Sequence, residues 1–446
     1  MSVRLACDRT NLGRHGLSVR PLKDAPLRGL STTFSRLLPS FAYARLRPFG
    51  ASKEHVPSTS STRTRWRKIV GYGSVCVVVV LLALLFVAWQ GMGQRAQGPR
   101  RARMERSAQW GGSGFVNPQP IENHVWTMLT GLFAVSPHAS PTGRVKTQTL
   151  DPRRLKDPPR SGLRITWLGH STNLIEIDGM RVLTDPSWSE RSSPIAWLGP
   201  KRWFAPPIAL GDLPKIDAVV ISHDHYDHLD HRTIIAMKDW NTTFIVPLGV
   251  GAHLAYWGVP EAHIVELDWW ERKQIGAMDV VCTPARHASG RSLFDKDATL
   301  WAGYAFLGPR HRMFFSGDTG MFPALRDIGA RLGPFDVTTI EIGQYNGAWP
   351  DWHIGPEQAV EAHRWLRGRV MLPVHWGKLQ LAYHGWTEPI ERVLAEAARE
   401  HVSVIAPMPG QSVEPEAPQR PERWWPSLPW QTAKQAPIIS SQVVGQ

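Results

Sequence analysis

The most apolar segment of the chain is residues 69–89, which contain no charged side chain. A helix of about 20 apolar residues is long enough to cross the hydrocarbon core of a bilayer. Trp66, Tyr72 and Trp89 occupy positions where aromatic side chains meet a membrane interface. A cleaved signal peptide usually has a shorter apolar stretch. The pattern therefore predicts a single uncleaved transmembrane helix.

From Leu163 onward the sequence pattern changes, and short apolar runs alternate with turn residues. Several runs are apolar throughout, which is typical of strands that are buried on both faces. Strand-like runs lie at 163–169, 173–179, 181–186, 216–222, 242–247, 278–284, 311–318, 335–343 and 369–377, and helical patterns at 356–366 and 388–400. Such a mixture predicts an α/β fold with layered sheets and outer helices.

These patterns divide the chain into five parts. We expect a basic arm without regular structure at 1–68, the membrane helix at 69–89, and a linker rich in Gly, Pro and Arg at 90–160. The linker contains one helical patch at 121–133. The large domain covers 161–413, and a tail rich in Pro and Trp follows at 414–446.

The net charge of +13 is concentrated in the N-terminal third of the chain. The arm 1–68 and the stretch 90–160 are both strongly basic, whereas the large domain and tail together carry a small negative charge. A nuclease needs a basic surface around its site, and the large domain and tail are slightly acidic instead. We therefore expect no nucleic-acid partner. The 3 cysteines have no C-x-x-C spacing, which excludes a thiolate zinc finger. Any metal ion must therefore be held by histidine and carboxylate.

The run 216–231 holds the most informative cluster of polar residues. Its apolar part ends at Ser222, and five ionisable side chains follow: His223, Asp224, His225, Asp227 and His228. In extended chain, His223 and His225 point the same way, and the helix predicted next would turn Asp227 and His228 toward a neighbouring position. A solvated polar loop is the simpler interpretation for an isolated histidine. Zinc, however, accepts imidazole and carboxylate ligands, and the H-x-H-x-D-H order is specific.

This motif resembles the hallmark of the metallo-β-lactamase superfamily. The resemblance implies a four-layered αββα sandwich and three further ligands, each at the end of a strand. His287, Asp318 and His375 stand at such positions. Singly, they could be a loop imidazole, a turn residue and a core histidine. Together, the resemblance assigns ligands to two zinc ions, with iron or manganese as alternatives: His223, His225 and His287 for the first, Asp227, His228 and His375 for the second, and Asp318 bridging both.

Longer strings narrow the resemblance. The runs 165–194, 199–203, 222–230, 283–291, 316–320, 352–363 and 373–382 are similar to bacterial relatives of N-acyl-phosphatidylethanolamine-hydrolysing phospholipase D. The resemblance implies that Asp185 supports the metal-binding histidines and that His353 lies beside the substrate phosphate. A turn at Asp185 and a helix cap at His353 are the alternatives. We expect Asp227, Asp318 and His353 to take part in catalysis.

The resulting hypothesis is a membrane-anchored, zinc-dependent phosphodiesterase of the phospholipase D type. Its substrate would be N-acylated phosphatidylethanolamine or a similar lipid or small phosphodiester. The alternatives are a lactonase-type hydrolase that acts on a phosphorylated small molecule and a non-catalytic, membrane-tethered metal-binding module. The tighter basic cluster, Arg63 to Lys68, precedes the apolar helix. It favours a single-pass protein of a bacterial inner membrane with the large domain in the periplasm.

Overall fold

The computed structural model describes residues 60–416 and 422–441, with the backbone alone for residues 60–64. Residues 1–59 of the predicted arm, and 417–421 and 442–446 of the predicted tail, lie outside the described residues. The chain divides into two compact units, 1–67 and 68–446. The second unit contains the sheets and the candidate site.

One sheet of the large unit has seven strands in the order β13-β1-β2-β3-β4-β5-β6. Its strands are β1 (Leu163–Gly169), β2 (Thr172–Ile177), β3 (Met180–Thr184), β4 (Ala218–Val220), β5 (Thr243–Pro247), β6 (Ile264–Leu267) and β13 (Ser412–Val413). Strands β3 to β6 run parallel, whereas β1 pairs antiparallel with both β2 and β13. The parallel part places the ends of β3, β4 and β5 at one edge.

The other sheet has six strands in the order β12-β11-β10-β9-β8-β7. Its strands are β7 (Arg272–Ile275), β8 (Met278–Thr283), β9 (Gly303–Leu307), β10 (Arg312–Phe315), β11 (Phe335–Glu341) and β12 (Gly368–Val374). Strands β10, β11 and β12 are parallel, and β7, β8, β9 and β10 pair antiparallel. Three strand ends of this sheet therefore also share an edge.

Successive side chains along the strands of the first sheet belong to two different hydrophobic cores, one on each face of the sheet. In β4, Ala218 and Val220 join the cluster shared with the second sheet, whereas Val219 faces the helices on the opposite side. In β5, Ile245 and Phe244 divide in the same way. Successive side chains of a strand point to opposite faces, so each sheet is covered on both sides.

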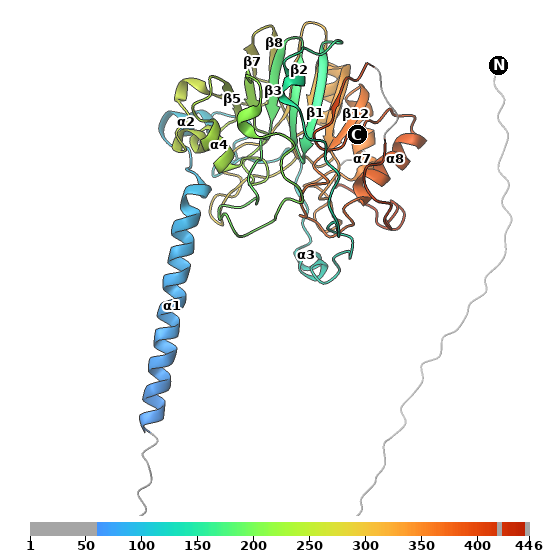
Figure 1. Ribbon diagram of the computed structural model, residues 1–446. Coiled ribbons are helices and arrows are strands. Elements are labelled where there is room, and N and C mark those ends of the chain that lie inside the picture. The colour runs from blue at the N-terminus through green and yellow to red at the C-terminus, as the bar shows by residue number, and fades with distance from the viewer. Residues whose placement is uncertain (1–59, 417–421, 442–446) are drawn as a thin grey trace, which may run out of the picture. The chain divides into compact units, whose positions relative to one another are not determined.

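Helices form the outer layers (Figure 1). The helices that pack on the sheets are α4 (His231–Met237), α5 (Gly251–Tyr256), α6 (Ala324–Leu332), α7 (Pro356–Trp365) and α8 (Glu388–Arg399). Buried residues of α4 and α5 pack on the first sheet, and those of α6, α7 and α8 on the second. Short 3-10 helices lie at η1 (Pro152–Leu155), η2 (Leu210–Asp212) and η3 (Glu261–His263). The predicted αββα order of layers is confirmed.

Residues 90–160, predicted as a linker, pack against the large domain. They contain α2 (Gly98–Met104) and α3 (Val125–Gly131), and Met104, Phe115 and Val145 belong to the main core. Arg100 forms ion pairs with Glu261 and Glu266, at 2.8 and 3.0 Å. The basic composition of this stretch therefore reflects ion pairs with the domain in addition to any solvated surface.

The described residues of the predicted tail, 414–416 and 422–441, contain no helix or strand, but they also pack on the domain. Trp424 and Trp425 are buried, and the Trp424 ring lies 5.2 Å from Trp376 and 6.0 Å from Trp167 between centroids. Tryptophan buries a large apolar surface. The tail is therefore part of the hydrophobic core.

The apolar run lies in α1 (Ser60–Met92). Within the described residues, Arg65–Met92 is the helix that is long and apolar enough to cross a membrane. Its apolar side chains are exposed, as Ile69, Val80 and Phe86 illustrate. The structure thus supplies a candidate membrane span where the sequence predicts one.

Candidate metal centre

The polar residues selected from the sequence gather where strands of the two sheets end. The H-x-H-x-D-H run follows β4, and His287 follows β8. Asp318 follows β10 and His375 follows β12. Loops at the carboxyl ends of adjacent strands meet at one edge of an α/β sheet. The fold therefore brings together segments that lie far apart in the sequence.

Three histidines form the first group of possible ligands. His223 Nε2 lies 2.8 Å from His225 Nδ1, and His287 Nε2 lies 3.3 Å from the same atom. His223 and His287 are buried, and the three nitrogens all lie within 4.8 Å of one another. This spacing can accommodate one ion bound by three imidazoles.

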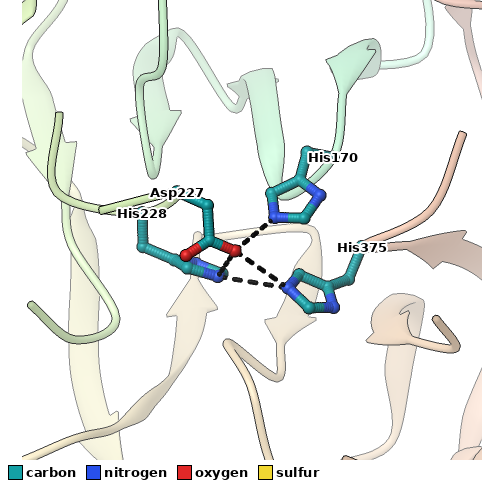
Figure 2. Close-up of side chains that lie close together, drawn as sticks. All are labelled: His170, Asp227, His228 and His375. Atoms are coloured by element: carbon teal, nitrogen blue, oxygen red, sulfur yellow. Dashed lines mark hydrogen bonds and ion pairs between the residues drawn. The ribbon is translucent and has the colours of Figure 1, made fainter. Parts of the chain in front are cut away.

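The second group contains Asp227, His228 and His375, with His170 beside them (Figure 2). Asp227 Oδ2 lies 3.2 Å from His228 Nε2 and 3.4 Å from His375 Nε2. The two imidazole nitrogens are 3.2 Å apart. Figure 2 shows Asp227 and His228, which are neighbours in the loop after β4, pointing toward His375 from another segment of the chain.

Asp318 lies between the two groups. Its Oδ2 atom is 3.1 Å from His228 Nε2 and 3.0 Å from His375 Nε2. The same oxygen lies 3.9 Å from both His223 Nε2 and His287 Nε2. A carboxylate in this position is close enough to both groups to contact an ion in each.

Hydrogen bonds on the outer side of the cluster determine which imidazole nitrogens face inward. His228 Nδ1 lies 2.7 Å from Asp185 Oδ2, and His287 Nδ1 lies 2.8 Å from the Trp352 carbonyl oxygen. Both partners are acceptors, so each Nδ1 carries the proton and each Nε2 presents its lone pair to the cluster. These tautomers are those required for metal binding.

The inward-facing lone pairs provide a test of whether the residues fit metal ions. His228 Nε2 and His375 Nε2 lie 3.2 Å apart. His375 Nδ1 lies 3.3 Å from Glu341 Oε2, which places the proton of the neutral ring on Nδ1 and leaves Nε2 facing the cluster. Two lone pairs at this distance repel, so a metal cation, or a proton directed at Asp318 Oδ2, must lie near both nitrogens. Asp318 Oδ1 is also buried without a hydrogen-bond partner in the described part of the chain. The donor set therefore fits a dinuclear metal site.

Burial and charge act in opposite directions on these groups. Burial lowers the pKa values of His228 and His375, but Asp318 and the other neighbouring carboxylates outweigh it and hold both well above their usual range, so a bound metal ion would displace those protons. Burial lowers the pKa values of His223 and His287 well below their usual range, which keeps both imidazoles neutral. Burial raises the pKa of Asp318, but the neighbouring His228 and His375 outweigh that effect and hold it well below its usual value. Neutral imidazoles and an ionised carboxylate are the forms that bind metal.

Asp185 lies directly behind the cluster, where the sequence resemblance places it. Its Oδ1 accepts from the Ser222 backbone N–H at 2.7 Å, and its Oδ2 accepts from the Ser222 hydroxyl at 2.6 Å. Oδ2 also contacts His228 Nδ1. Asp185 is fully buried, so these contacts fix the orientation of His228 and the start of the metal-loop residues 222–230.

His353 lies at the rim of the cluster, beside a carboxylate that the sequence analysis did not select. His353 Nδ1 is 2.7 Å from Glu341 Oε2 and 3.8 Å from Asp318 Oδ2. The His353 ring stacks on His375, with centroids 5.1 Å apart. Glu341 is buried and also accepts from the Thr319 backbone N–H. One carboxylate therefore orients both His353 and His375.

His170 was also missed by the sequence analysis. It lies in the turn between β1 and β2 with a φ of 57°, and its Nε2 is 2.7 Å from Asp227 Oδ2. Burial lowers the pKa of His170 to about 3, so the neutral ring donates from Nε2 to Asp227. The available signal was a polar residue directly after an apolar strand, as at Asp318 and His375. Glu341 ends β11 and carries the same signal.

A family profile described as the beta-lactamase superfamily domain matches residues 180–376, which include all of the proposed ligands. An uncharacterized protein of Mycobacterium tuberculosis is 55% identical over 269 residues, which cover 59% of this chain and 72% of that protein. The chain belongs to the metallo-β-lactamase superfamily. Its fold and its clustered histidines and carboxylates are those of a metal-dependent hydrolase of this superfamily.

Relatives with more specific names are also found. The N-acyl-phosphatidylethanolamine-hydrolyzing phospholipase D 1 of Caenorhabditis elegans is 39% identical over 229 residues, which cover 49% of this chain and 64% of that protein. The mitochondrial enzyme of the same name from Saccharomyces cerevisiae is 34% identical over 246 residues, covering 51% of this chain and 50% of that protein. The metallo-hydrolase Igni18 of Ignicoccus hospitalis superposes with a TM-score of 0.44 at 23% identity, over 56% of this chain and 97% of that chain.

Proposed function

We propose that the protein is a membrane-anchored phosphodiesterase that uses two zinc ions to hydrolyse N-acylated phosphatidylethanolamine or a similar lipid. The observation that carries the proposal is the convergence of five imidazoles and two carboxylates from four strand ends, with lone pairs facing one another. The named relatives in C. elegans and S. cerevisiae support a phospholipid as the substrate.

The proposed ligands divide as the sequence resemblance indicates. His223, His225 and His287 would hold one ion, Asp227, His228 and His375 the other, and Asp318 would contact both. With neutral imidazoles and two carboxylates, the ions retain a net charge of about +2, which attracts an anionic phosphate. Two zinc ions would supply Lewis acidity that polarises the phosphoryl oxygen and activates a water molecule at neutral pH.

The protein side chains would position the reacting groups and move the protons. His170 donates to Asp227 Oδ2 and holds that carboxylate in place. Asp318 Oδ1, which has no hydrogen-bond partner among the described residues, would accept a hydrogen bond from the attacking water. As oxygen attacks phosphorus and the bond to the headgroup alcohol breaks, His353 would protonate that alcohol from Nε2. Glu341 engages Nδ1 of His353 and so leaves Nε2 for the substrate.

We further propose that α1 inserts as a single span, with the N-terminal side in the cytosol and the large domain in the periplasm. Arg65 and Lys68 lie exposed at the entry to the apolar run. After the span, Arg100 and Arg103 are engaged by Glu266 and Glu271. Membrane-impermeant labelling of a cysteine introduced at exposed Ala398 in whole cells would test the orientation. Labelling that requires cell lysis would contradict it.

The activity is tested with the purified full chain in detergent. We expect about two zinc ions per chain and release of N-acylethanolamine and phosphatidic acid from N-palmitoyl phosphatidylethanolamine, measured by elemental analysis and mass spectrometry. Asp318→Asn should lower both metal content and turnover, the latter by about 100-fold or more. Asp239→Asn, at an exposed position, is the matched control.

Two results would contradict the proposal in different ways. A protein that binds no metal in the presence of zinc would remove the hydrolytic site altogether. If the protein binds two ions and cleaves lactones but leaves every phosphodiester intact, the proposed metal centre stands and the proposed substrate class is wrong. A metal-loaded protein inert toward both would favour a binding module.

A further inference from the structure

The exit of α1 is held by four side-chain contacts from the domain. The Gln90 carbonyl accepts from Trp257 Nε1 at 2.7 Å. The Gly91 carbonyl accepts from Arg291 at both Nε and Nη2, at 3.1 and 2.7 Å. Gln94 donates its backbone N–H to His253 Nδ1 at 3.1 Å. The chain therefore leaves the apolar helix through a fixed path rather than through a flexible tether.

Arg291 also belongs to the packing of the metal loop. The side chain is buried, its guanidinium lies 4.1 Å from the Tyr226 ring centroid, and Nη1 donates to the carbonyls of Asp224 and Leu229. A guanidinium presents several donors in one rigid plane. Arg291 thus forms hydrogen bonds both to the end of α1 and to the metal loop, which carries His223, His225, Asp227 and His228.

Two groups of exposed apolar side chains lie beside this attachment. Leu293 and Phe294 lie two and three residues after Arg291 and are 93% and 85% exposed. Trp197 and Leu198 are 62% and 51% exposed and follow Pro194. The Pro194 backbone lies so close to Gly91 that a Cβ placed on Gly91 would be 2.7 Å from Pro194 Cα. Each group therefore lies only a few residues from a contact with the end of α1, at Arg291 or at Pro194.

We propose that the loops 194–198 and 291–294 form a docking surface for the lipid bilayer into which α1 inserts. The proposal rests on the membrane insertion of α1 proposed above. The apolar part of α1 ends at Trp89, directly before Gln90 and Gly91, whose carbonyls accept hydrogen bonds from side chains of the domain. Phe294 is three residues from Arg291, at most about 10 Å of chain. The polar interface of a bilayer is about 5–8 Å deep on each side, so the exposed side chains are close enough to the end of α1 to reach it.

The attachment has a functional consequence for a lipid substrate. A domain on a flexible tether samples many orientations, whereas Arg291 and the docking surface would hold the metal loop at one height above the membrane. Aromatic and leucine side chains such as Trp197 and Phe294 are suited to the interface because they bury apolar surface there. The domain would therefore act on lipids in the membrane that anchors it.

The test is a measurement of depth with a fluorescent label on the full chain. Phe294→Cys is labelled with an environment-sensitive nitrobenzoxadiazole dye in a background carrying Cys7→Ser and Cys76→Ser, since Cys282 is fully buried. The protein is reconstituted into vesicles of phosphatidylcholine and phosphatidylglycerol in equal parts. Lipids with a nitroxide on the upper acyl chain should quench this label at least about twofold more than a label at Ala398→Cys on α8.

The outcomes separate the docking surface from the anchor. Equal quenching at both positions, with the protein still in the vesicles after an alkaline carbonate wash, would overturn the docking surface and leave the span intact. Loss of the protein from the vesicles in that wash would overturn the span and the docking surface together.

A second variant tests the effect on activity. Leu293→Ser combined with Phe294→Ser changes only exposed side chains, so folding and metal content should be retained. We expect hydrolysis of N-palmitoyl phosphatidylethanolamine in vesicles to fall by about threefold or more, with hydrolysis of soluble bis(p-nitrophenyl) phosphate unchanged. An equal loss with both substrates, or no loss with either, would contradict the proposal.

Discussion

Glu341 connects two residues of the candidate site that have different tasks. Its Oε2 lies 2.7 Å from His353 Nδ1 and 3.3 Å from His375 Nδ1. Groups that engage the outer nitrogen of a ligand imidazole fix its tautomer and increase its basicity. A side chain that contacts no reacting atom can therefore influence both metal affinity and proton transfer.

We expect Glu341→Gln to lower turnover and zinc affinity, each by about 10- to 100-fold, because an amide is a weaker acceptor for the His353 N–H group and removes the negative charge beside His375. Zinc affinity would be measured by competition with a chelator, and turnover from N-acylethanolamine release. Glu361→Gln, at an exposed position of α7, is the control. A variant with normal metal affinity and normal turnover would show that Glu341 has no positioning role.

The sequence identified most of the candidate site because each residue interrupts an apolar strand with a polar side chain. His223 was selected in this way, the resemblance to the metallo-β-lactamase superfamily pointed to His287, Asp318 and His375 at further strand ends, and the structure brings them together. His170 and Glu341 carry the same signal but lie outside the motifs used to search for ligands. Their roles depend on contacts with Asp227 and His353, which single-sequence patterns do not encode.

At the scale of elements, the strands with strong apolar patterns were predicted closely. Strands β1, β5, β8 and β11 begin within a residue of their predicted positions, as do helices α7 and α8. The missed strands β6, β7, β9 and β13 have weaker patterns. Strand β7 begins with three exposed polar residues, and β13 contains two residues that pair with β1. Their pairing depends on partners remote in sequence, which local periodicity does not reveal.

Helix α7 provides a test of how burial couples protonation to stability. His363 on this helix is buried, and its Nδ1 lies 2.7 Å from Thr338 Oγ1 on β11. Burial lowers the pKa of His363 from 6.5 to about 4. Above pH 6.5 the folded and unfolded chains are both neutral at this residue, but between pH 6.5 and 4 mainly the unfolded chain binds the proton.

The free energy of unfolding should therefore fall by up to about 1.4 kcal/mol per pH unit through this residue as the pH decreases from 6.5 toward 4. Chemical denaturation at pH 7.5 and 5 would measure the effect in the native protein and in His363→Gln. The stability difference between the two proteins should change by about 2 kcal/mol between these conditions. A difference that is the same at both pH values would refute the coupling.

At the scale of the whole molecule, segments that read as linker and tail complete the core. The Trp424 ring is 4% exposed and packs against Trp167, Trp376 and Trp386. Met104 and Phe115 make equivalent contributions from the segment after α1. Sequence composition classified the linker by its Gly, Pro and Arg content and the tail by its Pro and Trp content. It could not reveal that a few large apolar residues within them are buried.

We expect Trp424→Ala to lower the free energy of unfolding of the domain by about 3–5 kcal/mol, because it leaves a cavity among stacked aromatic rings. Denaturant unfolding followed by circular dichroism would measure the loss. Trp126→Ala, which removes a tryptophan that is 77% exposed, should change stability by no more than about 0.5 kcal/mol. Similar losses in the two variants would show that the tail packs only loosely.

The ion pairs between α2 and the domain bear on how a water-soluble version of the enzyme should be designed. A fragment that began at residue 161 would remove Arg100 and Arg103 and leave Glu261, Glu266 and Glu271 without those partners. It would also remove Met104 and Phe115, whose neighbours would then face solvent. Such a fragment should precipitate on expression, whereas one that starts just after Met92 keeps α2 and should remain in solution.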